Sequence, residues 1–191
     1  MAVIFVNILN ISSRNEFRLW LMENSTKMKE CYILLKRGKP INDDYFYYID
    51  AVEEALCFGW IDSIVINING KIYQKFSPRK KNSPWTELNK ERVRRLEKLG
   101  LMTPSGRKVL PKMGKRSFKI DIDIINALKK ARVYSKFKSF HPLYQRVRCY
   151  NISFYKKNKE LYEKALNHLI KLTKDGIMYG QWNDYGRLLN Y

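Results

Sequence analysis

Residues 50–100 decide the fold, and they read DAVEEALCFGWIDSIVININGKIYQKFSPRKKNSPWTELNKERVRRLEKLG. Val52 and Leu56 belong to an apolar pattern with helical spacing, which predicts a helix from Tyr45 to about Phe58. Gly59 follows at a place where the end of a helix favours a residue that can take a positive φ angle. The chain is therefore expected to leave the helix at Gly59 and to enter a strand.

Two strand-like runs follow this predicted helix. Residues 61–68 contain four isoleucines among polar residues, and residues 71–76 alternate between the two faces of a strand. The dipeptide Asn69-Gly70 between them is a strong signal for a two-residue turn, because both residues accept positive φ angles. The segment therefore predicts a β-hairpin.

A loop and a basic helix complete the segment. Ser83 as N-cap and Pro84 as first helical residue predict a helix that ends at Gly100. Its inward stripe would contain Trp85, Leu88, Val93, Leu96 and Leu99, and its outer face Lys90, Arg94, Arg95 and Lys98. Such a helix would present a row of cations beside the basic loop at residues 79–81.

The rest of the chain supplies helices and one further strand. Ser12 or Ser13, with Glu16 shortly after, predicts a capped helix up to Met22, and residues 30–36 form a short β-type run. Helical periodicity begins at Asp121 and marks three helices before Gly176. We therefore predict an α+β fold. Residues 1–110 would form a small antiparallel sheet covered by helices, and residues 111–191 a C-terminal helical segment packed against it.

The charge is large and unevenly distributed. The 191-residue chain has a net charge of +19, and residues 71–119 contain sixteen Lys and Arg against three Glu. A surface of this kind attracts polyanions such as nucleic acid or an anionic lipid surface. The alternative is a solvated basic face without a ligand.

Several classes of protein are not expected from the composition. No apolar stretch is long enough to span a bilayer, and the opening residues lack the features of a secretory signal, so we expect a cytoplasmic protein. Cys31, Cys57 and Cys149 lie in apolar or aromatic surroundings, which indicates buried free thiols. Two His and three Cys show no ligand spacing, so we expect neither a metal site nor a cofactor.

The candidate catalytic residues are Glu54, Cys57 and Asp62. Glu53 and Glu54 are adjacent in a helix and should point about a hundred degrees apart, so we expect Glu54 to pair with Asp62, or either of these with Arg79. A carboxylate pair can divide acid and base roles, and a thiol near a base can act as a nucleophile. The alternative interpretation is a buried structural ion pair and an inert thiol.

The candidate anion-binding residues combine cations with an aromatic side chain, the chemistry that stacks bases and holds phosphates. They are Arg79, Lys80, Lys81, Trp85, Arg92 and Arg94. The free amides at the predicted helix start, Ser83-Pro84, could also receive an anion. The alternative is that Trp85 is a core residue.

Three stretches, EEALCFGWIDS (53–63), FSPRKKNSPWTELNKERVRRLEKLGLMTPSG (76–106) and FHPLYQRVR (140–148), carry a resemblance to a known family. They are similar to the YdeI/OmpD-associated, or bacteriocin-protection, family of bacterial proteins. The resemblance implies a YjbR/CyaY-like α/β fold in the N-terminal part and a role in stress or antimicrobial-peptide resistance.

Together these observations predict a non-enzymatic cytoplasmic protein that binds an anionic partner through the basic loop and helix. One alternative is a small enzyme that uses Glu54, Cys57 and Asp62 in a cleft beside Trp60. Another is a dimerising scaffold that uses the aromatic C-terminus around Trp182. Shifted pKa values in a cleft would favour the enzyme, whereas an exposed basic face would favour the binding protein.

Overall fold

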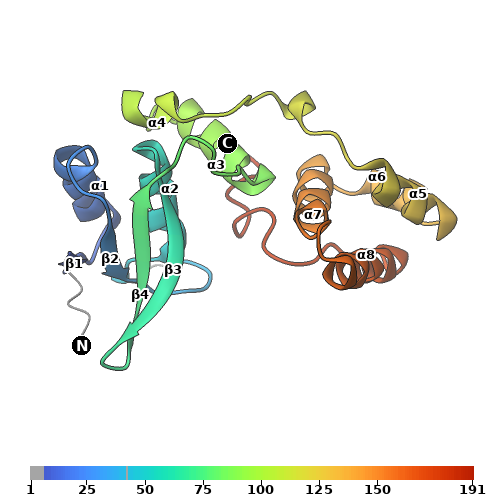
Figure 1. Cartoon of the computed structure of the whole chain (residues 1–191), viewed down its shortest axis with the longest axis horizontal. Coiled ribbons are helices and arrows are strands. Elements are labelled where there is room, and N and C mark those ends of the chain that lie inside the picture. The colour runs from blue at the N-terminus through green and yellow to red at the C-terminus, as the bar shows by residue number, and fades with distance from the viewer. Residues whose placement is uncertain (1–6, 42) are drawn as a thin grey trace. The chain divides into compact units, whose positions relative to one another are not determined.

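The computed structural model describes residues 7–41 and 43–191, and it confirms the α+β fold (Figure 1). The chain divides into two compact units. The first unit contains the chain up to Pro84 together with Val93–Pro111, and the second contains Trp85–Arg92 together with Lys112–Tyr191. Helix α3 (Glu87–Lys98) contributes its beginning to the second unit and its end to the first.

The first unit is built on a four-stranded sheet. Its strands are β1 (Ile8–Leu9), β2 (Cys31–Leu34), β3 (Trp60–Ile68) and β4 (Lys71–Pro78), in the order β1-β2-β4-β3. β4 pairs antiparallel with both of its neighbours, as expected, whereas β1 pairs parallel with β2. The sheet is therefore mixed, because α1 carries the chain from β1 to β2 in the same direction.

The predicted hairpin is confirmed. Asn69 and Gly70 have φ angles of 50° and 78°, which is the left-handed conformation that a two-residue turn of this kind requires. The hairpin of β3 and β4 extends well past the short strands β1 and β2 (Figure 1).

Helices α1 (Arg14–Asn24), α2 (Tyr48–Cys57) and α4 (Pro104–Lys108) complete the first unit. The Ser13 side chain caps α1 by accepting a hydrogen bond from the Glu16 amide, so the cap is the second of the two serines that the sequence offered. The ring of Phe17 on α1 lies 5.4 Å from the ring of Phe76 on β4, so α1 packs against the sheet. Helix α2 ends as predicted, since Gly59 has a φ angle of +75°.

The second unit contains the helices α5 (Ile122–Lys130), α6 (Tyr134–Ser139), α7 (Pro142–Phe154) and α8 (Lys159–Lys174), and the short 3-10 helix η1 (Lys115–Ser117). The sequence predicted three helices between Asp121 and Gly176, the first of them marked by apolar residues from Ile122 to Tyr134, and the prediction of this first helix is wrong. Arg132 takes a φ angle of +57°, and the turn that contains it divides this stretch into α5 and α6.

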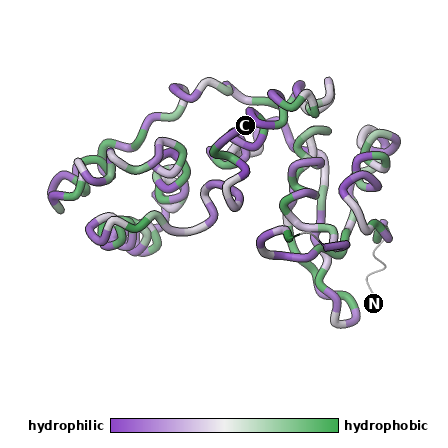
Figure 2. The backbone as a smooth tube through the Cα atoms, turned by 180° about the vertical axis from the view of Figure 1, so that it is seen from behind, coloured by the Kyte–Doolittle hydropathy of each residue, from purple (hydrophilic) through white to green (hydrophobic). Residues whose placement is uncertain are grey.

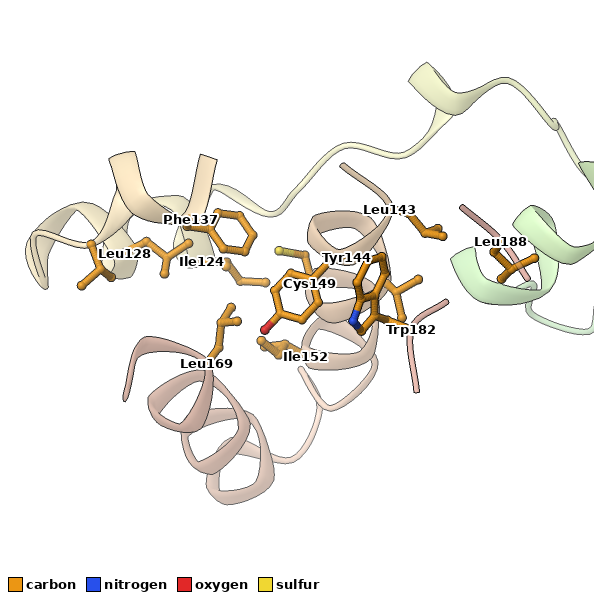
Figure 3. Packing of buried hydrophobic residues seen from close by; sticks show 12 residues of the cluster. Ile124, Leu128, Phe137, Leu143, Tyr144, Cys149, Ile152, Leu169, Trp182 and Leu188 are labelled. Atoms are coloured by element: carbon orange, nitrogen blue, oxygen red, sulfur yellow. The ribbon is translucent and has the colours of Figure 1, made fainter. Parts of the chain in front are cut away.

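The core of the second unit draws on all four helices and on the aromatic C-terminal segment. The tube in Figure 2 shows hydrophilic and hydrophobic residues interspersed along these helices, as expected for amphipathic helices with one buried face. Figure 3 shows the buried cluster, which includes Ile124, Leu128, Phe137, Leu143, Tyr144, Cys149, Ile152, Leu169, Trp182 and Leu188. The C-terminal segment therefore contributes Trp182 and Leu188 to a folded core.

Candidate functional site

Glu54 lies in a buried ion-pair network of the first unit. Arg14 Nε donates a hydrogen bond to Glu54 Oε1 at 2.6 Å, and Arg18 Nη1 donates to Glu54 Oε2 at 2.7 Å. The side chain of Glu54 is 1% exposed. Both carboxylate oxygens therefore accept from guanidinium groups, and the residue is placed to join α1 to α2.

Glu53 belongs to the same network, although adjacent helical residues were expected to point to different sites. Arg14 Nη1 donates to Glu53 Oε2 at 2.8 Å, and Arg95 Nη1 donates to Glu53 Oε1 at 2.8 Å. The expectation was wrong because the Arg14 guanidinium is wide enough to offer different nitrogens to Glu53 and Glu54. Arg95, expected on an outer face, is partly buried in this contact.

Asp62 does not supply the partner that the sequence suggested for Glu54. Its Oδ2 accepts a hydrogen bond from the Tyr48 hydroxyl at 2.6 Å, whereas Glu54 is held by Arg14 and Arg18. Arg79, the other suggested partner, donates to the backbone carbonyl of Pro84 at 2.9 Å. The predicted carboxylate pair is therefore replaced by two separate structural contacts.

Cys57 is buried, which raises the pKa of its thiol to about 12, with the neighbouring Glu54 carboxylate acting in the same direction. Cys31 and Cys149 are also buried free thiols. The thiolate is the nucleophilic form of cysteine. At neutral pH, Cys57 therefore remains a protonated thiol that packs in the core.

The two histidines make structural contacts in the second unit. His141 Nδ1 accepts a hydrogen bond from the Leu143 amide at the start of α7, and its ring lies 5.3 Å from the ring of Trp182. The ring of His168 lies 4.6 Å from that of Tyr179. In the part of the chain that the structure describes, no three His, Cys, Asp or Glu side chains gather to hold a metal ion.

Three of the six candidate anion-binding residues are buried. Arg79, Trp85 and Arg92 are each less than 9% exposed. Arg92 donates from Nε and Nη2 to the two carboxylate oxygens of Asp184, at 2.7 Å and 2.8 Å. The prediction that these three side chains face an external anion is therefore corrected, because Arg79 and Arg92 are directed to partners inside their own units and Trp85 is buried.

The other three candidates remain accessible. Lys80 and Lys81 are exposed in the loop after β4, and Arg94 is half-buried. Lys80 and Lys81 lie in the first unit next to Arg79, and Arg94 lies in the part of α3 that belongs to the same unit. They are the candidates that can still contact an external anion.

The predicted helix start at Ser83-Pro84 is also corrected. Helix α3 begins at Glu87, and the hydroxyl of Thr86 accepts a hydrogen bond from the amide of Asn89 at 3.0 Å. The first turn thus has a capping hydroxyl and a carboxylate, both of which satisfy the positive end of the helix. An anion at Ser83-Pro84 would meet no helix amides.

The second unit contains a basic surface that no sequence motif indicated. Residues 112–191 contain eighteen Lys and Arg against six Asp and Glu, and fifteen of these eighteen cations are exposed. We call these fifteen residues the helical basic surface. They are Lys112, Lys115, Arg116, Lys119, Lys129, Lys130, Arg132, Lys136, Lys138, Lys156, Lys157, Lys159, Lys164, Lys171 and Lys174.

The structure describes every residue of the second unit. Most carboxylates of this unit form ion pairs within it. Arg146 contacts Glu87 and Glu91, at 3.5 Å and 2.9 Å. Further pairs join Arg92 to Asp184, Lys156 to Asp121 and Asp123, and Lys159 to Glu163. Three cations of the helical basic surface, Lys115, Lys156 and Lys159, are partners in ion pairs of this kind. The surface keeps a large positive excess, because residues 112–191 contain eighteen Lys and Arg against six Asp and Glu.

A groove of about 780 Å³ opens in the first unit beside β1 and β2. Its lining is mainly apolar and includes Ile8, Leu34 and Phe46, with Lys71 among the polar residues. Lys36 also lines it, but its ammonium group is held by Asp43 at 2.7 Å. The groove contains none of the residues that the sequence singled out for catalysis.

No helix among the described residues is long and apolar enough to cross a membrane.

Comparisons with known proteins assign the first part of the chain to a family. No curated protein and no solved structure shows significant similarity to the chain. The sequence model of one family, "Domain of unknown function (DUF8412)", matches residues 9–109. Since this match covers more than half of the chain, the protein belongs to the DUF8412 family.

Proposed function

We propose that the protein binds a polyanion, with nucleic acid as the first partner to test, and that it does so without catalysis. The observation that carries the proposal is the excess of exposed cations in the second unit, where fifteen Lys and Arg of residues 112–191 are exposed and only six Asp and Glu are present. Fifteen exposed Lys and Arg in residues 112–191 would release counterions from a phosphate backbone on binding.

The helical basic surface lies outside residues 9–109, the part matched by the family. The exposed loop cations Lys80 and Lys81 lie within the match. The proposal therefore has two parts that can be tested separately. The helical basic surface provides most of the binding, and the loop adds a smaller contribution.

The resemblance to the YdeI/OmpD-associated family extends this proposal to a role in stress or antimicrobial-peptide resistance. A net charge of +19 disfavours direct capture of cationic peptides, so such a role would act through an anionic partner. The three buried free thiols support the expectation of a reducing compartment, and we propose the cytoplasm.

The enzyme alternative receives less support from the geometry. Glu54 has guanidinium groups on both of its carboxylate oxygens, and burial raises the pKa of Cys57 to about 12. Asp62 accepts a hydrogen bond from a tyrosine. A general base or nucleophile needs access to a substrate, and Glu54 and Cys57 are both buried.

Fluorescence anisotropy tests the proposal. Full-length protein is titrated against labelled single-stranded DNA, duplex DNA and RNA over a range of salt concentrations. We expect the logarithm of the binding constant to fall linearly with the logarithm of the salt concentration. On a single strand the slope should be about −0.7 for each phosphate contacted. The proposal would be overturned if the protein bound none of the three nucleic acids at about 50 mM salt.

Two matched variants locate the surface. Replacement of Lys129, Lys130, Lys164 and Lys171 by Gln should weaken binding and flatten the salt dependence. The same number of charges is removed from the first unit by replacing Lys27, Lys29, Lys80 and Lys81, all exposed, with Gln. A larger effect of the second variant would place the main binding surface in the first unit.

A further inference from the structure

One part of the helical basic surface is concave. A hollow of about 530 Å³ is lined by Arg132, Val133, Ser135, Lys136, Ser139 and Lys174. It is formed by the turn between α5 and α6, by α6 itself and by the C-terminal end of α8. Three of its six lining residues are cations, two carry hydroxyl groups, and none is a carboxylate.

A backbone hydrogen bond holds the charged group of one of these cations, and a turn fixes the backbone of another. Lys136 Nζ donates a hydrogen bond to the carbonyl oxygen of Lys174 at 2.7 Å, which fixes α6 to the end of α8. Arg132 is held in the left-handed conformation, at φ +57°, by a turn in which the Val133 amide donates to the Leu128 carbonyl at 3.0 Å. The wall formed by α6 and the end of α8 is therefore fixed before a ligand binds, so that less ordering of Lys136 is needed on binding.

We propose that this hollow binds a phosphate monoester group. Such a group carries a charge of about −1.5 to −2 at neutral pH and three terminal oxygens that accept hydrogen bonds. Arg132, Lys136 and Lys174 offer three positive charges around one concavity, and the exposed Ser135 offers a hydroxyl. A phosphodiester inside a strand carries only one negative charge and is joined to a nucleoside on each side. A hollow of this kind therefore favours a phosphate at the end of a strand over one in the middle.

The same chemistry occurs at the 5′-phosphate end of a nucleic acid and in a free nucleotide. For a nucleic-acid end, the inference rests on the proposed function. Anisotropy compares two single-stranded 12-mers, identical in sequence and labelled at the 3′ end, of which one carries a 5′-phosphate and the other a 5′-hydroxyl. We expect the full-length protein to bind the phosphorylated strand about tenfold more tightly, because one or two charge-assisted hydrogen bonds are added.

Equal affinity for the two strands would overturn the inference while leaving the proposed function intact. If neither strand binds, the proposed function fails, and calorimetric titration with a nucleoside monophosphate against the unphosphorylated nucleoside decides about the hollow. If the monophosphate binds saturably and the nucleoside does not, the hollow is supported as a nucleotide site. If the monophosphate does not bind, the inference about the hollow is overturned.

Variants assign the preference to the hollow. A triple variant should abolish the preference for the 5′-phosphate; it combines Arg132→Gln, Lys136→Gln and Lys174→Gln. Ser135→Asp should do the same, because it adds a carboxylate and leaves the hydrogen bond of Lys136 to α8 in place. Circular dichroism checks that each variant is folded. A folded Ser135→Asp protein that keeps the preference would overturn the inference.

The matched control removes three exposed charges elsewhere on the helical basic surface, by Lys112→Gln, Lys157→Gln and Lys164→Gln. This control should weaken binding of both strands by the same factor and leave their ratio unchanged, because general attraction to the backbone does not distinguish strand ends. A loss of the preference in the control would show that total charge, and not the hollow, produces it.

Discussion

Arg92 and Asp184 lie 92 residues apart in the sequence and form a two-pronged ion pair inside the second unit, with nitrogen to oxygen distances of 2.7 Å and 2.8 Å. They are 8% and 2% exposed. Arg92 Nη1 also donates to Asn89 Oδ1 at 2.7 Å. This pair ties the beginning of α3 to the C-terminal segment, so a residue that resembled an anion-binding cation is part of the internal structure.

Asp184→Asn should destabilise the protein by about 3 kcal/mol, because it leaves the Arg92 guanidinium buried without its counter-charge. Asn has nearly the same shape and accepts the φ angle of 49° at this position, so backbone strain is not introduced. Urea denaturation followed by circular dichroism measures the loss. A cost below about 1 kcal/mol would show that the pair is exposed to solvent in solution.

Arg14→Met should also destabilise the protein by about 3 kcal/mol, because Glu53 and Glu54 each lose one of their guanidinium partners in a buried site. The control is Arg107→Met, which removes the exposed pair with Glu97 at 2.8 Å. It should leave the denaturation midpoint almost unchanged, because solvent screens that pair. Equal effects of the two variants would contradict the buried network.

The close contact of α4 with the end of α2 depends on a glycine. A Cβ atom at Gly106 would collide with the carbonyl group of Cys57, whereas one at Gly114 would meet nothing within 4 Å. Gly106→Ala should therefore cost about 1–3 kcal/mol through overpacking. Gly114→Ala, measured in the same denaturation experiment, should leave stability nearly unchanged. A neutral Gly106→Ala would mean that α4 does not pack on Cys57.

The three thiols should resist labelling in the folded protein. Burial raises the pKa of each, to about 12, so the reactive thiolate is scarce at neutral pH. A disulfide-exchange reagent should modify the thiols quickly only after addition of denaturant, with mass spectrometry counting the modified sites. Fast modification of Cys57 in the native protein would revive the enzyme alternative.

Asp121 should make a measurable contribution to the acid sensitivity of the second unit. The Ser153 hydroxyl at 2.8 Å and then the Lys156 ammonium at 3.2 Å hold its pKa below the ordinary value of 3.8. Because the folded pKa is depressed, the stabilisation is complete above pH 3.8 and is lost as the pH falls through the folded pKa.

The comparison of wild type with Asp121→Asn isolates this effect. The difference in unfolding free energy between the two proteins should be constant from neutral pH to about pH 5 and should shrink below about pH 4. Denaturation curves at a series of pH values provide the measurement. A difference that does not change over this range would exclude a depressed pKa at Asp121.

Features encoded by neighbouring residues could be predicted from the sequence. The turn at Asn69-Gly70 and the glycine at position 59 are both found in the left-handed conformation, and Ser13 caps α1. Each depends on the conformational preference or the hydrogen-bonding reach of residues close in the chain. For this reason the hairpin, the start of α1, the end of α2 and the α+β class follow from the sequence.

The candidate site could not be predicted in the same way, because a charged side chain does not reveal its partner. Arg18, Glu54 and Arg92 have sequence surroundings similar to those of exposed charged residues, yet their partners lie 36 to 92 residues away. The spacing of Arg14 and Arg18 by one helical turn was the available signal for the network, and it is weak.

By itself the sequence determined the class of fold, its local turns and caps, and the large positive charge. Only the tertiary structure decided which charges face solvent. It directed Arg79 and Arg92 inward, paired most carboxylates of the second unit within that unit, and left fifteen of the eighteen cations of residues 112–191 exposed. The physical reason is that burying a charge costs free energy unless a partner is brought to it, and in these units the fold brings that partner from a distant part of the chain.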